Sequence, residues 1–233
     1  MPGGRHEVRG YHAGVLDGRA AFVTHASTSL GRSLATALAE LGATVSTSAE
    51  RFGERASAEA AFTAATAIDV VVHVCVDDDA LVPQPLADTA PHEWDARGEA
   101  LLRDAIFTFQ AAHSRFSPTG TGRVVLLAPT SGFTGAGGFV PASTAIEGAR
   151  ALAKSAARQW GRQAITVNTI LVPPALVTPE LVAATTFEAP PAVGQLPDVR
   201  DDVAATIAHF AAPTSGGISG STLIVDGGSV MAP

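Results

Sequence analysis

The chain has 233 residues, of which 46% are hydrophobic and 16% are charged, with 23 glycines and 15 prolines. This length suits one α/β domain, and the low charge with abundant apolar residues excludes a disordered chain. A formal net charge of −7 argues against a nucleic-acid partner, because phosphate binding needs a basic face. A single cysteine, Cys75, excludes an internal disulfide and a multi-cysteine zinc site, and no metal site is predicted.

The opening residues, 1–15, are polar and glycine-rich, and we expect them to form a tail before a single domain over 16–233. They lack the apolar core of roughly 7–15 residues that signal peptides carry. No run in the chain approaches the roughly 18 apolar residues of a membrane span. We therefore expect a cytoplasmic protein with no membrane partner.

Strand and helix signals alternate along the first third of the chain. A buried strand is predicted at 20–26, and a helix follows over 29–43, where apolar residues recur with a period near 3.6. Gly42 is expected to end this helix. After a short strand at 43–48, the β-branched run at 68–76 predicts a strand buried on both faces of a parallel sheet.

The same alternation continues to the end of the chain. The predicted elements are, in order, a helix from Trp94 or Asp95 to about Phe116, a strand at 122–129, a glycine-rich stretch at 131–139, a helix at 142–160, a strand at 164–172, a helix at 200–212 and a strand at 221–228. Strands alternating with helices of roughly 10–20 residues predict βαβ units. The fold class is therefore α/β, a doubly wound parallel sheet.

Several segments together resemble the short-chain dehydrogenase/reductase family, from Leu16 to Gly228. LDGRAAFVT, IDVVVHV, GRVVLLA, ALAKSAARQW, ITVN and ISGSTLIVDGG stand in family order and spacing. The resemblance implies one Rossmann-like domain. Between Ser48 and Ile68 the family places helix, strand and helix, which need about 35 residues. Only the nineteen residues 49–67 are available, so we predict one helix near 56–65 and about six strands instead of seven.

The resemblance implies a nicotinamide dinucleotide held on a TGxxxGxG loop, whose glycines let backbone N–H groups approach the pyrophosphate. The corresponding run here begins at Thr24, and His25 and Ser29 replace the first two glycines, so that only Gly31 remains. A Cβ atom at those positions restricts positive φ and blocks close backbone approach. NAD(P) binding is therefore expected to be weak or lost, and no cofactor is assigned.

Other polar residues near this loop are ambiguous. The hydroxyl groups of Ser27, Thr28 and Ser29 are suited either to an anion or to capping the helix that follows. The acidic run Asp77–Asp79 lies where the resemblance puts one side of the cofactor, and like charges there would oppose a pyrophosphate. It is equally typical of a solvated loop.

The resemblance also implies a catalytic Ser and a YxxxK pair, in which the Tyr is the acid/base and the Lys lowers its pKa. Matching LAKSAAR to the family puts these three residues at Pro129, Ala142 and Ile146. The chain's single Tyr is Tyr11 and its single Lys is Lys154, so no small shift restores the pair. General acid–base catalysis needs a titratable group within reach, and no catalytic residue is therefore assigned.

The remaining candidates have a structural and a functional interpretation. His73 lies in an apolar strand run, which favours a hydrogen-bonded core histidine over a catalytic one. Thr130, Ser131 and Ser143 lie near the former active site and either bind a ligand or serve loop turns and helix capping. Cys75 is expected to be a small buried apolar residue.

Three functions remain open. The chain is a pseudoenzyme subunit that assembles with an active relative, a non-redox enzyme of cyclase, dehydratase or lyase type in the old cleft, or an NAD(P)-dependent reductase with displaced catalytic residues. The first is favoured. Homo- or hetero-oligomers are expected through the helices around 95–116 and 142–160, because small residues on the second helix allow close helix approach. These residues are Ala142, Ala145, Gly148, Ala149, Ala153, Ala156 and Ala157.

Overall fold

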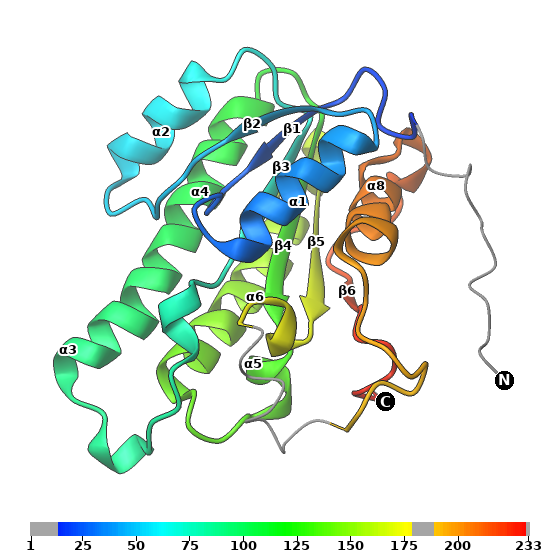
Figure 1. The fold of residues 1–233 in the computed structure, drawn as a ribbon. Coiled ribbons are helices and arrows are strands. Elements are labelled where there is room, and N and C mark those ends of the chain that lie inside the picture. Colours follow the sequence, from blue (N-terminus) through cyan, green and yellow to red (C-terminus); the bar gives the residue numbers. More distant parts are fainter. Residues whose placement is uncertain (1–13, 179–188, 232–233) are drawn as a thin grey trace, which may run out of the picture.

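A single parallel sheet of six strands organises the protein. The computed structural model describes residues 14–178 and 189–231, and in these ranges the strand order is β2-β1-β3-β4-β5-β6 (Figure 1). All neighbouring strands pair in parallel. The strands are β1 (Ala20–Val23), β2 (Thr44–Thr47), β3 (Val70–Val74), β4 (Gly122–Pro129), β5 (Ile165–Val172) and β6 (Thr222–Ile224). The sheet confirms the predicted doubly wound α/β class; the predicted tail lies, up to residue 13, outside the described residues.

Helices cover both faces of this sheet. They are α1 (Ser29–Glu40), α2 (Arg55–Ala64), α3 (Pro91–Trp94), α4 (Ala100–Phe116), α5 (Ser131–Thr134), α6 (Val140–Trp160) and α8 (Ala205–Ala211). Short π-helical segments at Asp95–Glu99 and Val199–Ala204 lead into α4 and α8. Helices α1 and α8 pack on one face, whereas α2, α4 and α6 lie on the other (Figure 1). In the described part of the chain, no helix combines the length and apolar character needed to cross a membrane.

The shortened connection between β2 and β3 confirms the prediction of six strands. Between Ser48 and Ile68 the chain forms α2 and no strand, and β2 lies at the edge of the sheet beside β1. Helix α2 spans Arg55–Ala64, close to the predicted 56–65. The nineteen residues available accommodate one helix and its loops.

In β1 and β6 the chain turns before the end of the predicted strand. After β1, His25 adopts a positive φ of 55°, which ends the extended conformation predicted to reach residue 26. After β6, the Asp226 carboxylate accepts hydrogen bonds from the backbone N–H groups of Gly228 and Val230. These bonds fold residues 226–230 into a turn in place of the strand predicted up to residue 228.

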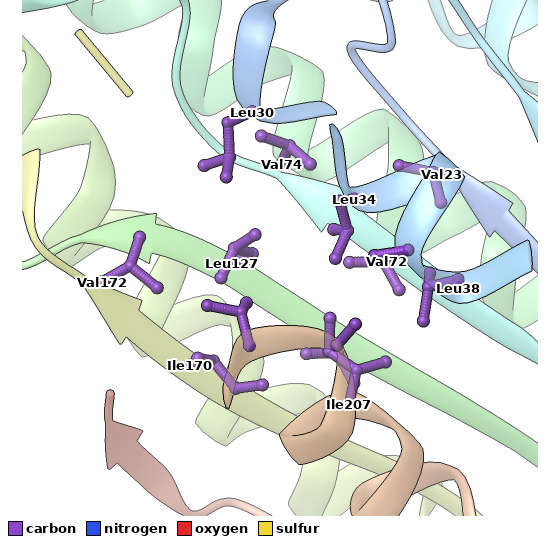
Figure 2. Close-up of a cluster of buried hydrophobic side chains, with 14 of the residues drawn as sticks. Val23, Leu30, Leu34, Leu38, Val72, Val74, Leu127, Ile170, Val172 and Ile207 are labelled. Carbon is purple, nitrogen blue, oxygen red and sulfur yellow. The ribbon is translucent and has the colours of Figure 1, made fainter. Parts of the chain in front are cut away.

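Side chains alternate between two buried clusters across the strands. In β3, Val72 and Val74 face α1 and α8, while Val71 faces α2, α4 and α6. Figure 2 shows the first cluster, in which side chains of α1 and α8 meet those of β1, β3, β4 and β5. Burial on both faces explains why the strands read as continuous apolar runs.

The small residues of α6 have a different role from the one expected. Six of its alanines are buried in the chain's own core: Ala142, Ala145, Ala149, Ala153, Ala156 and Ala157 are at most 8% exposed. A Cβ atom on Gly148 would lie 3.2 Å from Leu102 of α4. The small side chains therefore allow α6 to approach the sheet and α4 within one chain, and they are not evidence for an interface.

Gly31 is required where α1 begins. A Cβ atom there would collide with the carbonyl oxygen of His25, so the retained glycine permits close packing of α1 on the loop after β1. We expect Gly31→Ala to lower the free energy of unfolding by about 1–3 kcal/mol, measured by chemical denaturation. Gly53→Ala is the control, because Gly53 has open space around its Cβ position, and it should change stability by less than about 0.5 kcal/mol. Equal stabilities of the two variants would contradict this account.

Candidate functional site

The candidate site lies at the carboxyl ends of β1 and β3. The chain leaves β1 towards α1 on one face of the sheet and leaves β3 towards α4 on the other. In open parallel sheets such a reversal creates the crevice in which ligands bind. The loop that follows β1 carries His25 at this place.

His25 is held in the crevice by a short polar contact to α4. Its side chain is 1% exposed, and its Nε2 atom lies 2.6 Å from Oδ2 of Asp104, which is fully buried. Its Nδ1 atom lies 3.3 Å from the carbonyl oxygen of Val76 and 3.4 Å from Oδ1 of Asp77. The backbone of His25 is in the left-handed region, which is unfavourable for a residue with a side chain. The contacts of its imidazole stabilise this conformation.

Asp104 and Asp77 extend the network to the loop after β2. The second oxygen of Asp104 accepts a hydrogen bond of 2.7 Å from the backbone N–H of Phe52. The Nε atom of Arg51 lies 2.7 Å from Oδ2 of Asp77, and its guanidinium also donates to the carbonyl oxygen of Ala96. Arg51 thus bridges the loops that follow β2 and β3.

His73 is a core histidine beside this network, in agreement with its sequence interpretation. It is fully buried, and its Nδ1 atom lies 3.0 Å from Oγ1 of Thr24, which accepts a hydrogen bond from the N–H of Val74. The Nε2 atom of the ring lies 3.7 Å from Oδ2 of Asp104 and makes no hydrogen bond. In the described residues, no three His, Cys, Asp or Glu side chains are arranged to bind a metal ion.

The directions in which their pKa values shift indicate that His25 and Asp104 form an ion pair. Burial alone would lower the pKa of His25, but the hydrogen bond to Asp104 and the charges of Asp104 and Asp77 outweigh it and raise that pKa above 6.5. Burial alone would raise the pKa of Asp104, but His25, the charge of His73 and the N–H of Phe52 hold it below 3.8. Burial lowers the pKa of His73 to about 4. The charge of Asp104 raises this pKa but does not compensate for burial, and the charge of His25 lowers it further.

In the loop that resembles a nucleotide-binding loop, the hydroxyl groups of Ser27 and Thr28 make hydrogen bonds within the protein. Thr28 is the N-cap of α1, since its side chain accepts a hydrogen bond from the N–H of Gly31. The hydroxyl of Ser27 donates to the carbonyl oxygen of Ala49, and Ser29 is exposed at the first position of α1. Of the two interpretations, capping therefore applies to Thr28.

The three positions matched to catalytic residues are apolar and buried. Pro129 ends β4, and Ala142 and Ile146 lie one turn apart on α6 with no exposed surface. Lys154 is on the exposed part of α6, and Tyr11 lies outside the described residues. None of these three buried side chains donates or accepts a proton.

Five hydroxyl groups in the described residues are buried and make no hydrogen bond. They are those of Thr108, Ser131, Ser143, Thr178 and Thr222. Turn formation and helix capping, the structural interpretation of Ser131 and Ser143, are therefore not what their hydroxyl groups do. Thr130 is buried, and Cys75 is a free thiol with no exposed surface, as its apolar interpretation predicted.

The sequence interpretation missed Asp104 and the role of His25. The two residues are 79 positions apart, and no local pattern connects them. One signal was available, because Asp104 is the acidic residue within the apolar face of a long predicted helix. A charge at such a position requires a buried partner.

Comparison with known proteins agrees with the α/β fold described above. The family model described as enoyl-(acyl carrier protein) reductase matches residues 52–230. The 3-oxoacyl-(acyl-carrier-protein) reductase FabG of Vibrio cholerae is 28% identical over 244 residues, which cover 93% of this chain and 99% of FabG. The short-chain dehydrogenase/reductase eriH of Hericium erinaceus is 30% identical over 152 residues, which cover 62% of this chain and 59% of eriH.

The ion pair predicts how stability depends on pH. Because the native pKa of His25 is raised, its contribution is complete below about pH 6.5 and is lost as the pH rises through the native value. The contribution of Asp104, whose pKa is lowered, is present above pH 3.8 and is lost as the pH falls through its native value. The free energy of unfolding, measured by urea titration at several pH values, should therefore decline on the alkaline side.

The variant Asp104→Asn tests this assignment. It leaves the charge of His25 without its buried partner, so we expect a loss of about 3–5 kcal/mol and a flatter dependence above pH 6.5. Asp95→Asn, at an exposed carboxylate of the same helical segment, is the control and should keep the wild-type profile. An unchanged profile in Asp104→Asn would rule out the ion pair.

Proposed function

This chain belongs to the short-chain dehydrogenase/reductase family, and from that premise we propose that it is a non-catalytic member that assembles with an active relative. The usual reaction of the family needs a residue that transfers a proton while hydride moves to or from the cofactor. The positions matched to that machinery hold Pro129, Ala142 and Ile146, which are buried and apolar. This observation argues against the usual hydride transfer in this chain.

The crevice at β1 and β3 supports the same proposal. The residues present do not fit a dinucleotide, because the buried imidazole of His25 lies between the end of β1 and α4 and carries a Cβ where the family has glycine. Ser29 places a second Cβ at the start of α1. The pair of Arg51 and Asp77 bridges the loops above. The His25–Asp104 contact is the single observation that carries the inference that NAD(P) binding is weak or lost.

The outer faces of α4 and α6 are the surface that we propose for a partner. The exposed residues of α6 include Thr144, Ala151 and Ser155, and half-buried Leu152 and Leu102 lie between them and the core. The small uncharged side chains of Thr144, Ala151 and Ser155 suit a packed interface. Exposed charges on the same helices are Arg103 of α4 and Lys154 and Arg158 of α6. A subunit role also explains why an intact core is combined with apolar residues at the catalytic positions.

A second candidate function is a non-redox enzyme that uses the old cleft. The observation that favours it is the pair of buried hydroxyl groups on Ser131 and Ser143, which have no partner in the protein. The titratable groups near β1 and β3 are buried in their own network, and this leaves the second candidate without an evident acid or base.

Calorimetric titration with NAD⁺, NADH, NADP⁺ and NADPH tests the proposal on the cofactor. We expect no dissociation constant below about 10 μM, which corresponds to near 7 kcal/mol, because the crevice is filled. An active dehydrogenase measured in the same buffers shows that the titration detects binding. A tighter complex with any of the four cofactors would refute the inference drawn from His25.

The partner surface is tested by purification from the native cells. We expect an intact family member to co-purify with the chain, and Ala151→Arg should reduce its recovery at least about tenfold, because the new charge enters the interface. Ala60→Arg, on the exposed side of α2, is the matched control and should retain the partner. Light scattering that shows a stable monomer at micromolar concentration, with no partner recovered, would contradict the subunit role.

A further inference from the structure

His73 is a second buried histidine close to the carboxylate that pairs with His25. Its side chain has no exposed surface, and its Nε2 atom makes no hydrogen bond. This atom lies 3.7 Å from Oδ2 of Asp104, the same oxygen that is 2.6 Å from Nε2 of His25. The two imidazole rings meet edge to face, with their centroids 5.5 Å apart. One carboxylate oxygen is therefore close to two histidines.

The two histidines differ in how firmly the fold holds them. His73 belongs to β3, which pairs with β1 and β4, and its Nδ1 atom lies 3.0 Å from Oγ1 of Thr24. Asp104 belongs to α4, and its Oδ1 atom accepts a hydrogen bond from the N–H of Phe52. His25 belongs to a loop and has a left-handed backbone. Of the three residues, His25 is therefore the one whose place depends most on its side-chain contacts.

The charges around Asp104 make the loss of His25 costly unless another cation replaces it. A buried carboxylate without a partner is strongly unfavourable. Asp77 carries a second negative charge at this place, and the cation that contacts it besides His25 is Arg51. Departure of His25 would therefore leave one uncompensated negative charge in the cluster.

His73 is placed to supply the missing positive charge. A shift of about 0.7 Å would bring its Nε2 atom within hydrogen-bond distance of Asp104. Both nitrogens of an imidazolium carry protons, so Nδ1 would donate to the hydroxyl oxygen of Thr24 while Nε2 donates to Asp104. No rearrangement of β3 is needed for this exchange.

The causes of the low pKa of His73 point in the same direction. Burial lowers this pKa, the charge of Asp104 raises it, and the charge of His25 lowers it again. Departure of His25 removes one of the two lowering causes and leaves the attraction of Asp104 in place. The nearby thiol of Cys75 does not compete for the role, because burial raises its pKa and keeps it neutral.

We propose that Asp104 serves two histidines in turn: His25 in the structure described above, and His73, with one proton taken up from solvent, when His25 leaves. The two histidines thus form a proton-linked switch between the loop after β1 and β3. It keeps the buried carboxylate paired in both positions, so that release of His25 does not leave a charge without a partner. This inference goes beyond the proposed subunit role and does not rest on it, because it requires neither a cofactor nor a partner chain.

NMR titration of the imidazole groups between about pH 3.5 and 8 tests the switch. In the wild-type chain we expect His73 to take up its proton near pH 4. In His25→Gly, where glycine adopts the left-handed backbone without strain, the pKa of His73 should rise by at least about one unit, a tenfold gain in proton affinity. His25→Gln, which keeps a hydrogen-bond donor but not the charge, should shift it in the same direction.

Two controls connect this shift to Asp104. His209→Gln removes an exposed histidine of α8, on the other face of the sheet, and should leave the pKa of His73 at its wild-type value. In the double variant His25→Gly/Asp104→Asn the rise should disappear, because the carboxylate that attracts the His73 proton is gone.

Three results would overturn the switch. The first is an unchanged pKa of His73 in either folded His25 variant, and the second is a rise that persists when Asp104 is also replaced. The third is failure of both His25 variants to fold at about pH 5, since a charged His73 should then hold Asp104 in place of His25.

Discussion

The contact between His25 and Asp104 holds together the region on which the interpretation of this protein depends. It joins the loop after β1 to α4, and through Val76, Asp77 and Phe52 it includes the segments that follow β3 and β2. A buried ion pair contributes little net stability compared with apolar packing, but breaking one is costly because a charge is left without a partner. The network therefore fixes how four segments meet more than it adds to the total stability.

The shortened connection after β2 and the filled crevice are two parts of one arrangement. Because residues 49–67 contain one helix and no strand, Phe52 lies close to α4, where its N–H reaches Asp104 and its ring is buried among Phe62 and other residues of α2 and α4. Arg51, next to it, reaches Asp77 across the ends of β1 and β3. Arg51 and Phe52 therefore connect the short segment after β2 to the His25 network.

Local patterns predicted most of this fold. The apolar runs predicted β3, β4 and β5 because strands buried on both faces are mostly apolar. The length of the segment 49–67, compared with the helix, strand and helix that the family resemblance implies there, predicted the missing strand. The ends of β1 and β6 were missed, since they depend on the strained His25 and on the Asp226 carboxylate. The alanines of α6 suggested an interface because periodicity identifies an apolar face without showing what it packs against. The partner of His25, 79 residues away, follows from topology and not from spacing.

The buried polar groups of this region differ in whether the chain supplies their partners. Around His25, an ion pair, a backbone N–H and a guanidinium satisfy one another. The Nε2 atom of His73 beside them and the hydroxyl groups of Ser131 and Ser143 are buried without a partner. Ligand binding normally stabilises the folded state of a cofactor-dependent enzyme. Here the chain's own groups provide such contacts around His25, which agrees with the proposal that the chain folds without a dinucleotide.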